Sequence, residues 1–139
     1  MGCGLALGQF ETRGQFTASH RPYSIAVGDF NHDGILDLAV ATACCPNGGV
    51  YILLGNGDGT FKPGMYYSAG ISPTSVVAAD FDHDGDLDLA VANSLSDYVS
   101  ILLGNGEGHF APARRVPPLP RPRPAFPAAT SMAMVGSIW

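Results

Sequence analysis

Short runs of aliphatic and β-branched residues alternate along the chain with clusters of Gly, Asn and Asp. No segment keeps an apolar period of 3.6 residues, so the pattern predicts strands rather than helices. The first two strands of each half are almost wholly apolar, which predicts burial on both faces between stacked sheets. The expected strands lie near residues 23–29, 36–42, 49–54, 60–67, 74–80, 87–93, 98–103 and 109–113.

The two halves of the chain are copies of one sequence unit. Residues 22–41 align without a gap with residues 73–92, at an offset of 51. Residues 52–61 align with residues 101–110 at an offset of 49, so one connecting loop is two residues shorter in the second copy. A repeat of this kind predicts a modular fold in which each copy forms one supersecondary unit.

Each copy has the size of a β-propeller blade, which has four strands over about 50 residues. The Asn-Gly and Asp-Gly pairs within Gly55–Gly59 predict a hairpin between the last two strands of the first copy, because these pairs tolerate positive φ. We therefore expect an all-β chain, a partial β-propeller of two four-stranded blades plus a degenerate partial repeat. The expected units are a partial degenerate repeat at 1–20, repeats at 21–68 and 69–113, and a Pro/Arg-rich, disordered tail at 114–139.

One loop in each copy, between its first and second strands, carries most of the acidic residues of the chain. Oxygen-bearing side chains fall at positions 1, 3, 5 and 9 of each nine-residue loop, and glycine falls at position 6. With the backbone carbonyl at position 7 included, the candidate metal ligands are Asp29, Asn31, Asp33, Ile35 and Asp37 in the first loop and Asp80, Asp82, Asp84, Asp86 and Asp88 in the second.

This spacing fits calcium, which takes six to eight oxygen ligands. Alternate residues of a curling loop point to one side, and glycine at position 6 permits the sharp turn. The alternative is that the aspartates are solvated turn residues that cap backbone amides, but two copies with one ligand pattern favour the metal. Val40 and Val91 occupy position 12, where an EF-hand needs a bidentate Glu, so the loops are not EF-hands. Zinc is disfavoured because the loop histidines sit at even positions.

The segments Val27–Gly34 and Leu102–Phe110 resemble FG-GAP/VCBS repeats, which occur in integrin α-subunit propellers and in many bacterial secreted proteins. The resemblance covers roughly residues 7–113. It implies a β-propeller with Ca²⁺ in the loop between the first two strands of a blade, an extracellular or cell-surface setting, and a role in adhesion or ligand binding. The side chains at loop positions 1, 3, 5 and 9 match the ligand positions of the family.

The charge of the chain and the absence of targeting segments limit the kinds of partner that the sequence predicts. Residues 1–112 carry twelve acidic and three basic residues, which makes the chain a poor match for nucleic acid. No apolar run is long enough to span a membrane, and no signal peptide is visible. Cys3, Cys44 and Cys45 form an odd set whose pairing the sequence leaves open, and Cys44 and Cys45 are read as ordinary loop residues.

We expect a calcium-binding repeat protein that acts as a scaffold for extracellular adhesion or for recognition of a protein or carbohydrate ligand. The residues form no catalytic constellation, so we expect no enzymatic activity. Two alternatives stay open: a propeller fragment of, or appendage to, a secreted hydrolase or lyase, and a gene fragment without independent function. Because so few blades leave sheet faces and edges open, we also expect self-association or marginal stability that improves with calcium.

Overall fold

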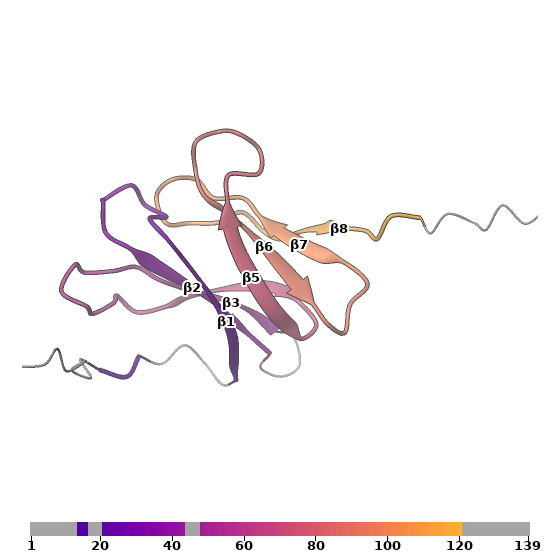
Figure 1. The fold of residues 1–139 in the computed structure, drawn as a ribbon, viewed down its shortest axis with the longest axis horizontal. Coiled ribbons are helices and arrows are strands. Elements are labelled where there is room, and N and C mark those ends of the chain that lie inside the picture. The colour runs from indigo at the N-terminus through magenta and orange to yellow at the C-terminus, as the bar shows by residue number, and fades with distance from the viewer. Residues whose placement is uncertain (1–13, 17–20, 44–47, 121–139) are drawn as a thin grey trace, which may run out of the picture.

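The computed structural model describes residues 14–16, 21–43 and 48–120, and within them every regular element is a strand. Figure 1 shows these strands arranged in two groups along the chain. They are β1 (Pro22–Gly28), β2 (Asp37–Thr42), β3 (Gly48–Leu53), β4 (Met65–Gly70), β5 (Pro73–Ala79), β6 (Asp88–Asn93), β7 (Val99–Leu102) and β8 (Arg114–Val116).

Each sequence copy folds into its own four-stranded antiparallel sheet. The strand order is β1-β2-β3-β4 in the first sheet, hereafter sheet 1, and β5-β6-β7-β8 in the second, sheet 2. The register repeats with the sequence: Ala26 pairs with Ala39 in sheet 1, as Val77 pairs with Ala90 in sheet 2. The prediction of an all-β chain is confirmed, and the two sheets are consistent with propeller blades.

The hairpins after β3 and β7 close as their turn residues predict. Gly57 and Gly59 have φ values of 83° and 86°, in a backbone region that residues with a Cβ atom avoid. The Asn56 amide donates to the Thr60 carbonyl at 2.9 Å, and Gly55 then bridges Phe61. The equivalent bridge joins Gly104 and Phe110 in the second copy.

The last strand of each sheet starts later than the sequence predicts. The strand predicted at 60–67 is confirmed only over residues 65–67, because β4 begins at Met65, and the strand predicted at 109–113 is wrong, because β8 begins at Arg114. Lys62 and Ala111 still donate their amides across the hairpins, to Leu54 and Leu103. Pro63 and Pro112 come next and carry no N–H group, so the hydrogen bonds between the paired strands are interrupted there. They begin again in β4 and β8. Residues 114–116, assigned to the tail by sequence, therefore complete sheet 2.

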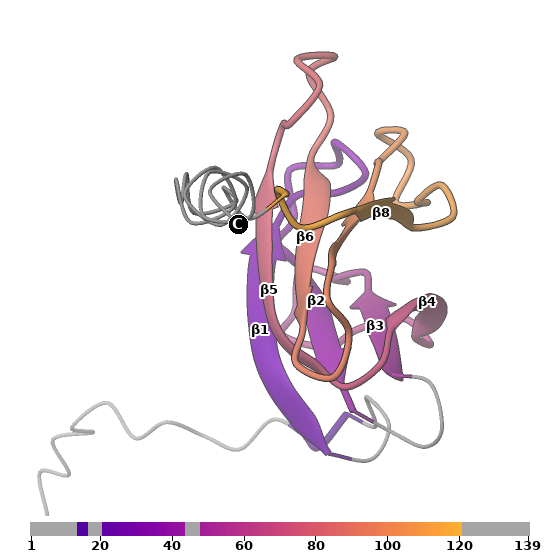
Figure 2. The ribbon, with the colours of Figure 1, turned by 90° about the vertical axis from the view of Figure 1, so that its right-hand side faces the viewer.

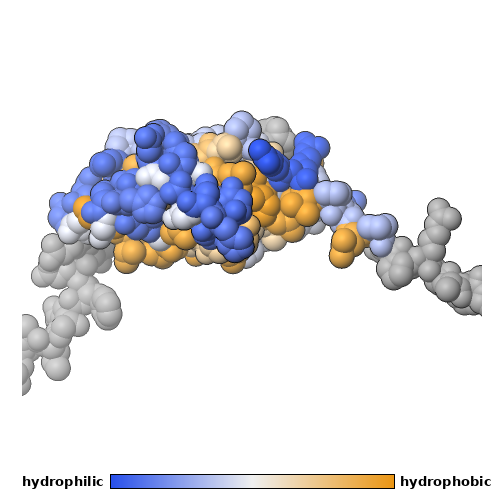
Figure 3. All heavy atoms as spheres, turned by 90° about the horizontal axis from the view of Figure 1, so that it is seen from above, coloured by the Kyte–Doolittle hydropathy of each residue, from blue (hydrophilic) through white to orange (hydrophobic). Residues whose placement is uncertain are grey.

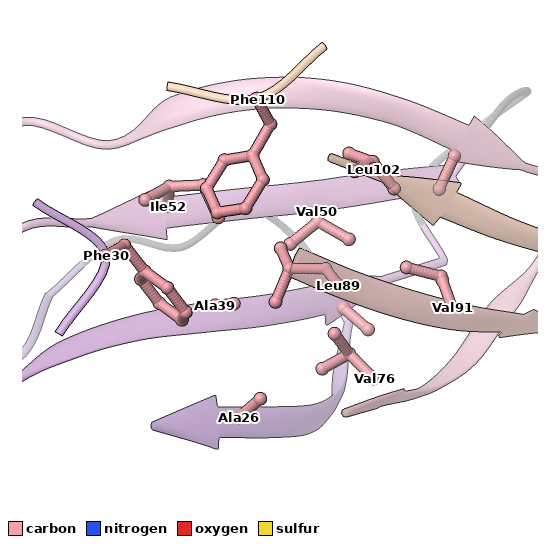
Figure 4. Close-up of a cluster of buried hydrophobic side chains, with 12 residues drawn as sticks. Ala26, Phe30, Ala39, Val50, Ile52, Val76, Leu89, Val91, Leu102 and Phe110 are labelled. Carbon is pink, nitrogen blue, oxygen red and sulfur yellow. The ribbon is translucent and has the colours of Figure 1, made fainter. Parts of the chain in front are cut away.

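The two sheets stack face to face and enclose the core. Figure 2 shows β1 and β5 side by side at one edge of the stack, with β4 and β8 towards the other. The side chains between the sheets interleave, as Figure 4 shows for Ile52, Leu89 and Leu102, which are fully buried. Phe30 and Phe110 close the core beside the loops, with an edge-to-face contact of 5.6 Å between ring centroids.

Burial on both faces is confirmed for β2 but is wrong for β1 and β5. The outward side chains of β1, Ile25 and Val27, are 57% and 54% exposed, and Val77 of β5 is 54% exposed. In the described part of the chain each sheet has a neighbouring sheet on one face only, and the exposed side chains of β1 and β5 lie on the other face.

Several predictions from the sequence lie outside the described residues. These concern residues 1–13, most of the degenerate repeat, Cys3, Cys44, Cys45 and the tail beyond residue 120. Within the degenerate repeat, Phe16 is described, and its ring contacts the ring of Phe61 with centroids 5.1 Å apart.

Candidate metal centres

The β1–β2 and β5–β6 loops share one backbone conformation. Gly34 and Gly85, at loop position 6, have φ values of 80° and 96°, so the prediction that this position needs glycine is confirmed. His32 and His83, at position 4, also adopt positive φ, at 57° and 63°. Two left-handed residues, two positions apart, curl each loop back on itself. Figure 3 looks onto this end of the molecule, where hydrophilic side chains gather beside hydrophobic surface.

The carboxylate at position 1 holds this curl together. Both oxygens of Asp29 accept backbone amides, from Asp33 at 3.2 Å and Gly34 at 2.9 Å. Asp80 does the same with Asp84 at 3.2 Å and Gly85 at 3.0 Å. Desolvation by itself would raise the pKa of Asp29, but backbone amides, that of Gly34 first, outweigh it and hold this pKa below its ordinary value.

The carboxylate at position 9 is buried and joins the loop to the neighbouring hairpin. Asp37 has no exposed surface and accepts amides from Phe30 and Gly55, both at 2.8 Å. Asp88 is equally buried and accepts amides from Phe81 and Gly104, also at 2.8 Å. Each carboxylate therefore fixes the start of its own loop and the start of the following hairpin turn.

Gly55 and Gly104 are supporting residues that the sequence reasoning missed. A Cβ atom on Gly55 would lie 2.4 Å from the Leu36 carbonyl oxygen, and one on Gly104 would lie 2.2 Å from that of Leu87. Only glycine brings its amide close enough to reach the buried carboxylate without this clash. The repetition of Leu-Gly-Asn-Gly behind both loops is the signal that could have found them.

The second loop brings three carboxylates together. One oxygen from each of Asp80, Asp82 and Asp88 lies within 4.8 Å of the others. Calcium binds oxygen at 2.3–2.6 Å, so two ligands on opposite sides of the ion are about 4.6–5.2 Å apart, and this cluster could hold such an ion. The capping of backbone amides does not exclude a metal, because an ionised carboxylate offers about four lone-pair positions.

The carboxylates of this cluster repel one another. Desolvation raises the pKa of Asp82, and the neighbouring charges of Asp84 and Asp88 raise it further. A bound cation would relieve this repulsion, since an opposite charge favours the ionised form.

The first loop carries fewer charges. Asn31 replaces Asp82, and its side-chain nitrogen donates to Asp33 Oδ2 at 2.8 Å, while its oxygen accepts the Asp33 amide at 3.2 Å. Asp29 and Asp37 keep the positions that Asp80 and Asp88 hold in the second loop. A neutral oxygen at position 3 offers a cation less charge than the Asp82 carboxylate does.

Position 5 is not one of the three clustered carboxylates, although Asp84 lies close enough to Asp82 to raise its pKa. Asp33 Oδ1 and Asp84 Oδ1 each accept the amide of position 7, from Ile35 at 2.8 Å and from Asp86 at 2.9 Å. Their role as ligands, like that of the position-7 carbonyls, stays a prediction.

The two loops also touch each other. His32 Nε2 lies 2.8 Å from Asp86 Oδ1, and this hydrogen bond raises the pKa of His32. The Gly108 amide donates to the Phe30 carbonyl at 2.8 Å, which links the second hairpin to the first loop. The loops are thus part of the contact between the sheets, which sequence spacing alone did not indicate.

Antiparallel four-stranded sheets, repeated along the chain and each carrying an acidic loop between its first two strands, define a repeat protein of the propeller-blade class. The model for the FG-GAP-like repeat matches residues 40–91 and 80–133, and the model for the FG-GAP repeat matches residues 21–53. The chain belongs to the FG-GAP repeat family. Comparison with curated proteins and with solved structures gave no match.

Proposed function

We propose that this chain is a calcium-stabilised scaffold that presents a binding surface for a protein or carbohydrate ligand outside the cell. The observation that carries the proposal is the cluster of Asp80, Asp82 and Asp88 in an FG-GAP repeat. The extracellular setting and the recognition role are supported by the family, whose members are typically extracellular. The described part of the chain contains no helix capable of crossing a lipid bilayer.

Calcium would act on the fold through the loops. Phe30 belongs to the first loop and is also a buried residue of the core, packed on Phe110 of the second hairpin. A cation that orders the first loop therefore stabilises the contact between the sheets. Its role is structural, and we propose that the chain has no catalytic activity of its own.

Calorimetric titration with CaCl₂ tests the calcium part of this proposal. We expect uptake at two sites with dissociation constants on the order of 10⁻⁴–10⁻³ M, the range of extracellular modules, with the second loop binding more tightly because its ligands carry more charge. Asp82→Ala should remove the tighter site and Asn31→Ala the weaker one. Asp97→Ala, an exposed aspartate outside both loops, is the matched control and should leave both sites intact.

Titration with MgCl₂ distinguishes a specific site from diffuse attraction of cations. Magnesium demands near-ideal octahedral geometry and keeps several waters, so it should bind much more weakly. Absence of calcium uptake, or uptake that Asp82→Ala and Asn31→Ala leave unchanged, would contradict the proposal.

A further inference from the structure

The contact between the two sheets joins two different faces of one repeating unit. Face A of sheet 1 consists of Ser24, Ala26, Ala39, Ala41, Val50 and Ile52. It packs on face B of sheet 2, which consists of Val76, Ala78, Leu89, Val91, Ser100 and Leu102. Face A is built mainly of small side chains and face B mainly of larger ones, so face B fills the space that face A leaves.

Each sheet carries both faces, because the two sheets are copies. Face A of sheet 2 consists of Ser75, Val77, Ala90, Ala92, Val99 and Ile101, and five of these six residues are identical to their counterparts in sheet 1. Face B of sheet 1 consists of Ile25, Val27, Leu38, Val40, Tyr51 and Leu53, and three of these six match sheet 2.

The second face A is open along β5 and β7, and the second face B is open along β1. On sheet 2, Val77 and Val99 are 54% and 41% exposed, whereas Ala26 and Val50, their counterparts in sheet 1, are buried. On sheet 1, Ile25 and Val27 are exposed, whereas Val76, the counterpart of Ile25, is buried. Val40 and Leu53 are already buried, so the uncovered part of face B lies along β1.

The residues that make specific contacts between the sheets have exposed equivalents in the other copy of the repeat. Ser24 Oγ accepts the Val76 amide at 3.2 Å, and the counterpart of Ser24, Ser75, is exposed. Phe30 is 3% exposed where it meets the second hairpin, but its counterpart Phe81 is 44% exposed. Gly108, which donates its amide to Phe30, is buried, but its counterpart Gly59 is exposed.

We propose that these open faces bind a second copy of the chain head to tail, with face A of sheet 2 in one copy stacked on face B of sheet 1 in the next. The interface would continue the one already inside the chain, with β5 of one copy beside β1 of the next, as β1 lies beside β5 in Figure 2. Such a contact is heterologous, so an open assembly keeps one free face A at one end and one free face B at the other, and further copies can add. The inference rests on the packing of the sheets and not on calcium binding.

Two surface variants test this arrangement in the 139-residue chain. Ile25→Asp places a charge on the open face B, and Val77→Asp places one on the open face A. Both side chains are more than half exposed in the single chain, so neither change should disturb the core. Leu95→Asp, at a 73% exposed position in the β6–β7 turn, is the matched control. Circular dichroism checks that each variant is folded, and Ile25→Lys and Val77→Lys replace any variant that is not.

Sedimentation velocity and light scattering at tens of micromolar protein in calcium read out the assembly. The wild type and Leu95→Asp should form species larger than a monomer, and each face variant alone should sediment as a monomer. Mixed in equal amounts, the two variants should form a dimer and nothing larger, because each supplies the intact face that the other lacks.

Other outcomes overturn the proposal. A monomeric wild type would mean that no second copy binds, and that water or another segment of the chain covers these faces. Loss of assembly in one variant but not in the other would indicate a symmetric contact of one face with itself. Monomeric single variants that give no dimer on mixing would also contradict the head-to-tail arrangement.

Discussion

Removal of the buried carboxylate at position 9 should destabilise the fold even when no metal is present. Asp37 accepts amides from Phe30 and Gly55 at 2.8 Å and has no exposed surface. A hydrogen bond to a charged group contributes about 1.5–3 kcal/mol, so Asp37→Ala should lower the free energy of unfolding by about 3–6 kcal/mol. Asp37→Asn keeps one acceptor oxygen but turns an NH₂ group towards the other amide, so it should lose at least half as much.

Urea unfolding followed by far-UV circular dichroism, in EDTA and in calcium, measures this loss. Chelation removes any contribution from a bound ion, so the loss that remains in EDTA belongs to the two hydrogen bonds. Asp97→Ala is the control and should change the free energy of unfolding by no more than about 0.5 kcal/mol. If Asp37→Ala cost less than about 1 kcal/mol in EDTA, or destabilised the protein only in calcium, the carboxylate would not be the clamp between loop and hairpin.

Three further predictions follow from the site. Gly55→Ala should destabilise the protein by about 1–3 kcal/mol in the same urea assay, because its Cβ would clash with the Leu36 carbonyl 2.4 Å away; wild-type stability would refute this close approach. Addition of 10 mM CaCl₂ to the chelated protein should raise the free energy of unfolding by about 1.4 kcal/mol for each site with a dissociation constant of 10⁻³ M, and an unchanged melting curve would exclude stabilisation by calcium. Asp86→Asn should lower the pKa of His32, measured by NMR in the metal-free protein, because the hydrogen bond to Asp86 raises it. This pair stabilises the fold below the unfolded-state pKa of histidine, and the contribution is lost as the pH rises through the folded-state pKa of His32; a pKa that does not respond to Asp86→Asn would show that the contact is not formed in solution.

Most of the local structure could be predicted from the sequence, because it depends on residues close together in the chain. The turn at Gly34, the hairpin at Gly57 and the oxygen at every second loop position all follow from backbone preferences and spacing over fewer than ten residues. The fourth strands were misplaced because the bridges at Phe61 and Phe110 satisfy the hairpin before the prolines interrupt it.

The sequence by itself determined the repeat, the all-β blades and the acidic loops with their candidate ligands. Only the tertiary structure decided which face of each blade is covered, since Ile25 and Val76 are both β-branched apolar residues at the same place in their repeats, yet Ile25 is exposed and Val76 is buried. It also decided that Gly55 supports Asp37 and that His32 meets Asp86, residue pairs 18 and 54 positions apart. The first contact depends on the pairing of β2 with β3 and the second on how the sheets stack, and no local pattern of residues encodes either.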